Sequence, residues 1–222
     1  MILFSFRQNS SVIRSILMIL TALVCGVTSA PVFAAPIIDA ADDFLPSFNG
    51  PHNGDLDVLR AEVFFNGTDF TFRSFHNGAI GTTEEALYVW GVDRGTHNQF
   101  FGDFRPGVLF DIIVVLRPDL TGTIIDFAPN PVANVNLAPG SVTVSGNMIQ
   151  GVVSANFLAS KGLLPVDYKV NLWPRTGLAN NEQIADFAPD NDVAPVTTPE
   201  PSSMLLLSGG LLSLVLSRRR TA

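Results

Sequence analysis

The central part of the chain consists of short segments in which polar and apolar residues alternate, and this pattern most limits the folds that it can adopt. Residues 69–73 alternate in this way, residues 57–65 are rich in Val and Phe, and Asn66-Gly67 lies between the two segments. Asn-Gly between two such segments is the strongest short-range signal for a β-hairpin. Residues 141–153 repeat the arrangement around Ser145-Gly146-Asn147, which predicts a second hairpin.

Further strand signals follow at intervals of ~8–15 residues, and helical periodicity is scarce. One short helical piece is expected at 154–160. The spacing predicts an all-β fold, a single antiparallel β-sandwich of jelly-roll-like type over residues 35–187. The remaining strands are expected at 86–92, 108–116, 123–127, 167–173 and 183–187.

The N-terminal end has the pattern of a secretory signal peptide. An apolar run from Ile16 to Val27 follows Arg7 and Arg14, and Val32-Phe33-Ala34 places small residues before Ala35. This pattern predicts a signal peptide over residues 1–34, which signal peptidase removes by cutting between Ala34 and Ala35. An uncleaved membrane anchor is the alternative.

The C-terminal end combines three features in a fixed order. Pro199-Glu200-Pro201 precedes an apolar run over 204–216, and Arg218-Arg219-Arg220 follow it. As a helix, such a run spans ~20 Å, which is short of a ~30 Å hydrocarbon core. The arginines are expected on the cytoplasmic side. The run therefore suits a transient hold on the inner membrane better than a permanent anchor.

This tail resembles the PEP-CTERM sorting signal of Gram-negative bacteria, over residues 197–222. The resemblance implies an exosortase that cuts the chain at or near the motif, and a final place at the cell surface or outside the cell. Because such tails accompany exopolysaccharide systems, it also implies exopolysaccharide or other matrix components as partners. An ordinary tail anchor, which needs a longer span and no Pro-Glu-Pro, is the alternative. The resulting organisation places a Pro-rich stalk at 188–201 and a sorting helix with a basic tail at 202–222.

The two end segments change the composition that matters for function. They hold five of the 13 basic residues, so residues 35–201 keep all 20 acidic residues and have a net charge of −12. This acidity argues against a nucleic-acid partner. The single cysteine, Cys25, falls in the signal peptide, which excludes a disulfide framework and a Cys-rich zinc module.

Catalytic motifs are missing from the sequence. Neither His-Glu-x-x-His nor Gly-x-Ser-x-Gly occurs, and the three histidines are expected in exposed loops. Glu84-Glu85 and the pair Asp55 and Asp57 leave a secreted hydrolase as the third functional interpretation, because glycoside hydrolysis uses two facing carboxylates. The leading interpretation is a non-enzymatic structural or interaction module.

Oxygen ligands gather near both ends of the predicted domain, and no other cofactor is indicated. In a sandwich the first and last strands often lie side by side, which would bring these groups together, and Ca²⁺ binds six to eight oxygens. A solvated acidic surface is the alternative. The candidate calcium ligands are Asp42, Asp43, Asp55, Asp57, Asp186, Asp190 and Asp192, with Asp39, Asn53 and Asn191 nearby.

A short repeat accompanies these acids. Asp43-Phe44-Leu45-Pro46, Asp126-Phe127-Ala128-Pro129 and Asp186-Phe187-Ala188-Pro189 share Asp-Phe-x-Pro. Since proline ends a strand, we interpret them as three equivalent strand exits with a buried Phe. A repeated ligand-binding motif is the alternative.

Two tryptophans carry the remaining hypothesis, a carbohydrate-binding module. Trp90 and Trp173 would stack on sugar rings if they faced outward, whereas strand aromatics are more often buried. Residues 54–57 and 87–93 resemble DOMON-like and family 9 carbohydrate-binding β-sandwiches. That resemblance supports the fold class and carries over no site residues.

Overall fold

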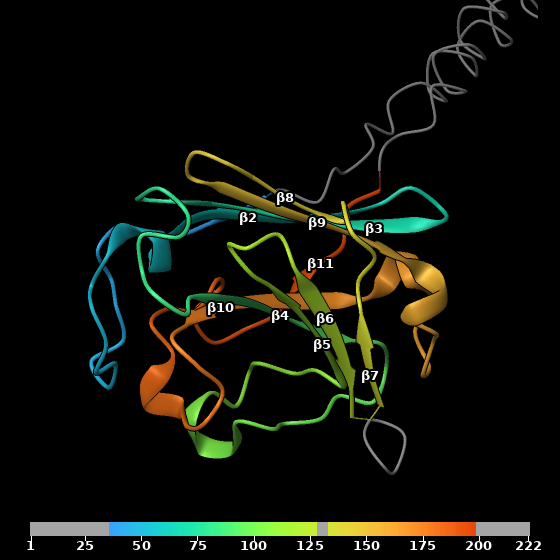
Figure 1. Ribbon diagram of the computed structural model, residues 1–222. Coiled ribbons are helices and arrows are strands. Elements are labelled where there is room, and N and C mark those ends of the chain that lie inside the picture. The colour runs from blue at the N-terminus through green and yellow to red at the C-terminus, as the bar shows by residue number, and fades with distance from the viewer. Residues whose placement is uncertain (1–35, 128–132, 199–222) are drawn as a thin grey trace, which may run out of the picture. The chain divides into compact units, whose positions relative to one another are not determined.

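Two antiparallel sheets form the fold in the computed structural model, which describes residues 36–127 and 133–198 (Figure 1). The first sheet has the strand order β1 (Ile37–Ile38), β2 (Val58–Phe65), β3 (Asp69–His76), β9 (Met148–Ser154) and β8 (Val142–Ser145). The second has the order β11 (Ala194–Pro195), β10 (Lys169–Arg175), β4 (Leu87–Asp93), β5 (Ile112–Leu116), β6 (Gly122–Asp126) and β7 (Ala133–Asn136). The predicted all-β antiparallel sandwich is confirmed.

The described helices are all single 3₁₀ turns between strands. They are η1 (Gly54–Leu56), η2 (Gly102–Phe104), η3 (Ala155–Phe157), η4 (Pro165–Asp167) and η5 (Asn181–Gln183). Within the described ranges, no helix has the length and apolarity needed to cross a membrane. The predicted signal peptide and sorting helix lie outside those ranges.

Three connections cross between the sheets, namely β3 to β4, β7 to β8 and β9 to β10. β3 and β9 are neighbours in the first sheet, and their successors β4 and β10 are neighbours in the second. Two of the three crossings thus run between adjacent positions. Tight hairpins connect β2 to β3, β5 to β6 and β8 to β9, whereas long loops connect β1 to β2, β4 to β5 and β10 to β11.

Both predicted hairpins are confirmed. β2 pairs with β3 up to Phe65 opposite Phe70, and the Asn66 side chain accepts hydrogen bonds from the N–H groups of Thr68 and Asp69. Gly67 has φ 103°, which residues with a side chain rarely adopt. β8 and β9 likewise pair around Gly146 and Asn147.

Side chains of β3 point alternately to its two faces, and those on one face are buried between the sheets. Phe70 and Phe72 are fully buried. Their rings lie 5.6 Å from Tyr168 and 5.5 Å from Trp90 of the opposite layer. These aromatic contacts form the centre of the core.

A second aromatic cluster covers the outer face of the second sheet. Trp173 contacts Phe101 and Phe110, with ring centroids 5.1 and 5.0 Å away. Gly91 makes room for the indole, since a Cβ there would lie 2.5 Å from Trp173. β4 and β5 are therefore buried on both faces, and their sequences are almost continuously apolar.

The predicted stalk at 188–201 is wrong for its described part, because residues 188–198 pack on the sandwich. β11 pairs with β10, and Val196 and Thr197 are 5% and 8% exposed. The Thr197 N–H donates to the Val63 carbonyl at 2.7 Å, and the Thr197 carbonyl accepts from the Phe65 N–H at 2.8 Å. The prolines are compatible with this packing because an edge strand tolerates residues without an N–H.

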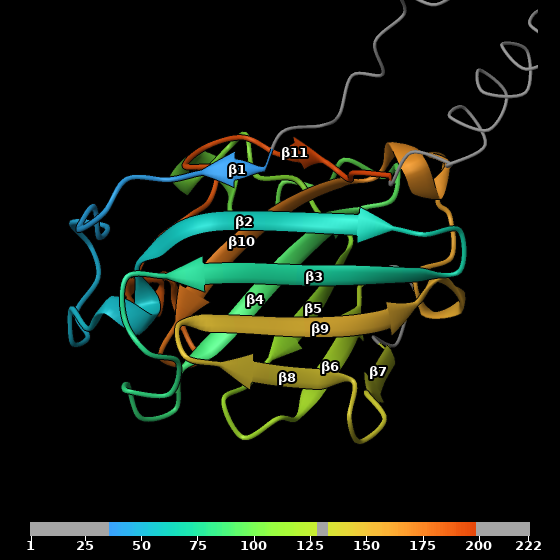
Figure 2. The ribbon, with the colours of Figure 1, turned by 90° about the horizontal axis from the view of Figure 1, so that it is seen from above.

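Both ends of the domain use the same sheet edge. β1 pairs with Arg60 and Ala61 of β2, and Thr197 pairs with β2 at Phe64. In Figure 2, β1 and β11 follow one another along this edge, above β2. The chain enters and leaves the sandwich at neighbouring points.

Packing of residues 188–198 predicts a stability effect that a stalk would not have. Val196→Ala removes two buried methyl groups and should lower the free energy of unfolding by about 2 kcal/mol. Thr198→Ala, at an exposed neighbouring position, should leave it unchanged. Urea denaturation measures the free energy of unfolding of the two variants. Equal values would support an unpacked stalk and contradict the packing of residues 188–198.

Candidate functional site

Five aspartates from both ends of the domain meet beside the start of β2. Asp39, Asp43 and Asp190 each place a carboxylate oxygen within 4.8 Å of the others, and Asp43, Asp57 and Asp186 do the same. Asp43 belongs to both groups. We call these five residues the aspartate cluster.

Hydrogen bonds with the backbone of β2 position two members of the cluster. Asp39 follows β1, and its N–H donates to the Leu59 carbonyl at 3.2 Å. Asp186 approaches from the other end of the chain and accepts a hydrogen bond from the Val58 N–H at 2.9 Å. Asp186 also accepts from the Phe187 N–H at 2.6 Å. Both chain ends are thereby fixed to the start of β2.

Asp57 is the most constrained member. Its Oδ2 accepts from the Asp42 N–H at 2.8 Å and from the Asn77 amide at 2.9 Å. Its Oδ1 is buried and has no hydrogen-bond partner. Asp42 reaches this position with φ 64°, a conformation that Asp tolerates better than most residues.

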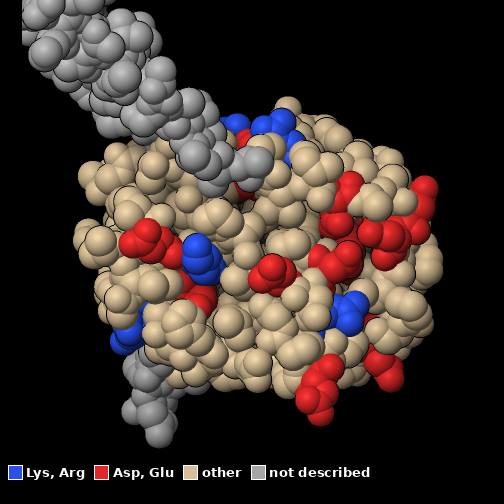
Figure 3. Space-filling view, turned by 180° about the vertical axis from the view of Figure 1, so that it is seen from behind, with Lys and Arg blue, Asp and Glu red and all other residues tan. Residues whose placement is uncertain are grey.

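Mutual repulsion and burial dominate the electrostatics of the cluster. Burial and the nearby carboxylates of Asp39 and Asp43 raise the pKa of Asp186 to about 8. Burial, Asp43 and Asp190 raise the pKa of Asp39 to about 7. Among the described residues, none of the five forms an ion pair with Lys, Arg or His. Acidic side chains also outweigh basic ones on the face in Figure 3.

The structure brings together four of the seven predicted calcium ligands, namely Asp43, Asp57, Asp186 and Asp190. The other three have separate positions. The buried Asp55 accepts from the Thr83 N–H and hydroxyl at 2.8 and 2.6 Å. Asp192 accepts from the Val193 N–H, and Asp42 contributes its backbone N–H to Asp57.

The Asp-Phe-x-Pro repeat divides between two roles. Asp43 and Asp186, from the first and third copies, both belong to the cluster. Asp126, from the second copy, accepts from the Arg94 guanidinium at 2.7 Å. The three strand exits are therefore not equivalent.

The predicted sugar-stacking residues are core residues. Trp90 is 0% and Trp173 2% exposed. Trp90 packs between the sheets and Trp173 under the outer aromatic cluster, so neither can meet a sugar ring in this fold. The expectation of exposed loop histidines is likewise wrong for His76, which lies in β3 and is fully buried against Ser74 and Tyr88.

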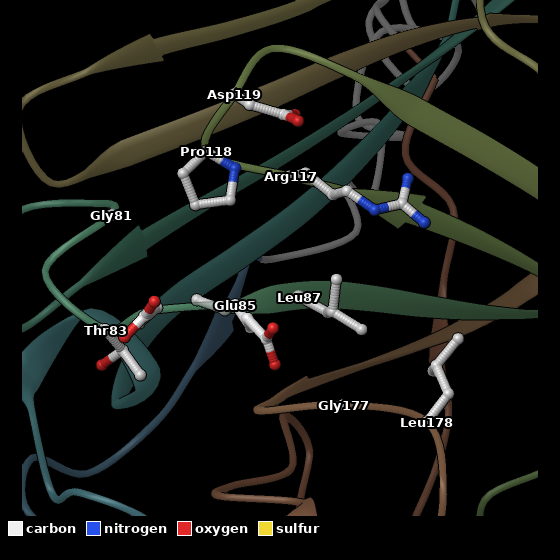
Figure 4. A pocket seen from close by; sticks show the side chains of 11 residues that line it. Gly81, Thr83, Glu85, Leu87, Arg117, Pro118, Asp119, Gly177 and Leu178 are labelled. Carbon is white, nitrogen blue, oxygen red and sulfur yellow. The ribbon is translucent and has the colours of Figure 1, made fainter.

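A separate cavity of about 600 Å³ opens at one end of the sandwich. In Figure 4, Arg117, Pro118 and Asp119 of the β5–β6 turn face Thr83, Glu85 and Leu87 at the start of β4, with Leu178 nearby. Glu84 also lines it. The predicted pair Glu84-Glu85 is therefore at a cavity, whereas Asp55 and Asp57 point to different surroundings.

The segment that leaves the aspartate cluster leads directly into the C-terminal tail. A family model of the PEP-CTERM protein-sorting motif matches residues 197–220. The chain carries a PEP-CTERM sorting motif. The motif marks an exported protein that is held in the membrane for a time and is processed by exosortase. Its first residue, Thr197, is hydrogen-bonded to β2.

Other predicted parts of the PEP-CTERM protein lie outside the described residues. These are the signal-peptidase site Ala34 and Ala35, the motif residues Pro199, Glu200 and Pro201, and the basic residues Arg218, Arg219 and Arg220. No curated protein and no solved structure matches the chain. The resemblance to DOMON-like and family 9 sandwiches gains no support beyond the fold class.

The raised pKa values predict an unusual pH dependence for the cation-free protein. Unfolded aspartates titrate near 3.8, but Asp39 and Asp186 titrate near 7 and 8 in the fold. Between these values the folded state binds more protons than the unfolded state. The contribution of these two aspartates to stability should therefore be complete below about pH 4 and be lost as the pH rises through about 8.

Urea denaturation in the presence of a chelator at about pH 5 and about pH 8 measures this effect. Asp186→Asn should reduce the difference between the two conditions. Asp119→Asn is the control, because hydrogen bonds from Thr121 lower the pKa of Asp119 and it stays ionised at both. Equal stability of the unmodified chain at the two pH values would contradict the prediction.

Proposed function

We propose that the β-sandwich is a non-enzymatic structural or interaction module that the PEP-CTERM tail delivers to the cell surface or the extracellular matrix. The observation that carries this proposal is the position of the chain ends. β1 and Thr197 lie on the same edge of β2, and one residue, Thr198, separates Thr197 from Pro199-Glu200-Pro201. The sorting tail therefore begins at the sandwich itself, with no spacer, and β7 and β8 at the far edges of the two sheets stay available to partners.

Sorting is tested by replacing Pro199-Glu200-Pro201 with alanines or by deleting Arg218–Arg220 in cells that contain an exosortase. Both variants should stay in the inner-membrane fraction at full length. The first variant lacks the Pro-Glu-Pro motif, and the second lacks the basic residues that follow the apolar run. Pro139→Ala, at an exposed proline outside the motif, should be released normally. Normal release of both motif variants would refute processing by this route.

The structural role is tested by following the released protein in cells that make exopolysaccharide. We expect it to sediment with the extracellular matrix and to dissolve when the polysaccharide is degraded. Protein found entirely in the soluble medium would argue against a matrix role.

A second candidate function is direct carbohydrate binding, and the cavity of Figure 4 favours it. Three carboxylates, those of Glu84, Glu85 and Asp119, supply acceptors for sugar hydroxyls beside the apolar Leu87 and Leu178. Small-molecule sites combine an apolar lining with a few polar groups in this way. This site would replace the buried tryptophans.

A glycan array with the full chain distinguishes the two functions. Binding through the cavity should fall at least tenfold, ~1.4 kcal/mol, in Glu85→Gln and Leu178→Ala. Leu164→Ala should bind normally, because Leu164 is 65% exposed and lies outside the cavity. If the unmodified chain binds no glycan on the array, carbohydrate binding is refuted and the structural role remains.

A further inference from the structure

The aspartate cluster gathers five carboxyl groups, and no basic side chain among the described residues is paired with them. Asp57 and Asp186 are each 1% exposed. Buried carboxylates are ordinarily paired with a basic side chain or bound to a metal, and no ion pair in the described ranges includes a member of the cluster. A cation would supply the missing positive charge.

Unpartnered oxygens inside the cluster point independently to a ligand. Asp57 uses Oδ2 for two hydrogen bonds, while its buried Oδ1 has none. Buried oxygens of Asp39 and Asp43 also lack a partner. Most buried polar groups in native proteins are hydrogen-bonded, so three such acceptors in one place indicate a missing partner, and a cation would also offset the repulsion between the carboxylates.

We propose that the aspartate cluster is a calcium site. Oxygens on opposite sides of Ca²⁺, at bond lengths of about 2.3–2.6 Å, lie about 4.6–5.2 Å apart. The oxygens of each aspartate group lie within 4.8 Å of one another, which fits this coordination shell. Asp57 and Asp186 form its buried side, Asp190 lies on its solvent side, and the half-buried Asp39 and Asp43 lie between them.

The chemistry of the donors selects among cations. All five side chains offer hard carboxylate oxygens, which suit Ca²⁺ or Mg²⁺ and not metals that prefer His or Cys. Mg²⁺ usually keeps several waters in a strict octahedron, whereas Ca²⁺ accepts a larger and less regular set of protein oxygens. The buried carboxylates of Asp57 and Asp186 leave little room for retained water, and this favours Ca²⁺.

Bound calcium would join the two ends of the domain. Its ligands come from residues 39–43 after β1, from Asp57 before β2, and from residues 186–190, which lead to β11 and Thr197. The ion would thus hold the segment that enters the sorting motif. Since calcium is abundant outside the cytoplasm, this edge of the sandwich would be stabilised after export.

Calorimetric titration tests the site with the full chain, purified in detergent and stripped with EGTA. We expect saturable binding of CaCl₂, and at least tenfold weaker binding of MgCl₂. At a calcium concentration ~100-fold above Kd, the melting temperature should rise by about 5–10 °C. No saturable calcium binding, or an unchanged melting temperature at saturation, would overturn the site.

Three variants locate the ion. Asp43→Asn, in the residue shared by both groups, should abolish the calcium-induced rise in melting temperature. Asp190→Asn, at an exposed position that the fold tolerates, should weaken binding at least tenfold. Asp192→Asn is the matched control, because Asp192 is exposed, close in sequence and outside the cluster. If Asp190→Asn binds calcium as Asp192→Asn does, the site is not the aspartate cluster.

Discussion

The outer edge of β2 is the constraint on which the two ends of this structure depend. An edge strand presents unpaired backbone groups, and here β1 and Thr197 cover those of Arg60, Ala61 and Phe64. Segments separated by more than a hundred residues are thereby placed side by side. This placement forces the acidic residues that flank both segments into a common space, and it brings the start of the PEP-CTERM motif onto the sandwich.

The interior makes this edge possible. Phe70, Phe72, Trp90 and Tyr168 fill the space between the sheets. Asp57 and Asp186 are also buried, at the start of β2. Burial then raises the pKa of Asp39 and Asp186. A sandwich without disulfides can tolerate such a cluster because the aromatic core supplies the stability, while a cation of suitable size would remove the remaining repulsion.

The sequence predicts the features of the fold that depend on residues close together in the chain. Asn66-Gly67 sets the β2–β3 hairpin through its own turn, and the continuous apolar runs of β4 and β5 mark the buried centre. β1 and β11 have two residues each, so they are defined only by pairing with partners that are distant in sequence. Without that pairing, the sequence of residues 188–198 indicates a stalk. The expected neighbourhood of the first and last strands does gather Asp43, Asp57, Asp186 and Asp190. Asp55 could not be separated from them by sequence alone. Asp55 lies in η1, whose turn aims its carboxylate at Thr83.

The calcium site is tested most directly by a crystal structure of the protein from crystals grown with calcium. An anomalous scattering peak should lie between the carboxylates of Asp43, Asp57 and Asp186, about 2.3–2.6 Å from their oxygens. Thr197 should remain paired with β2. Density that shows no ion among these carboxylates, or residues 188–198 extended away from the sandwich, would contradict these predictions.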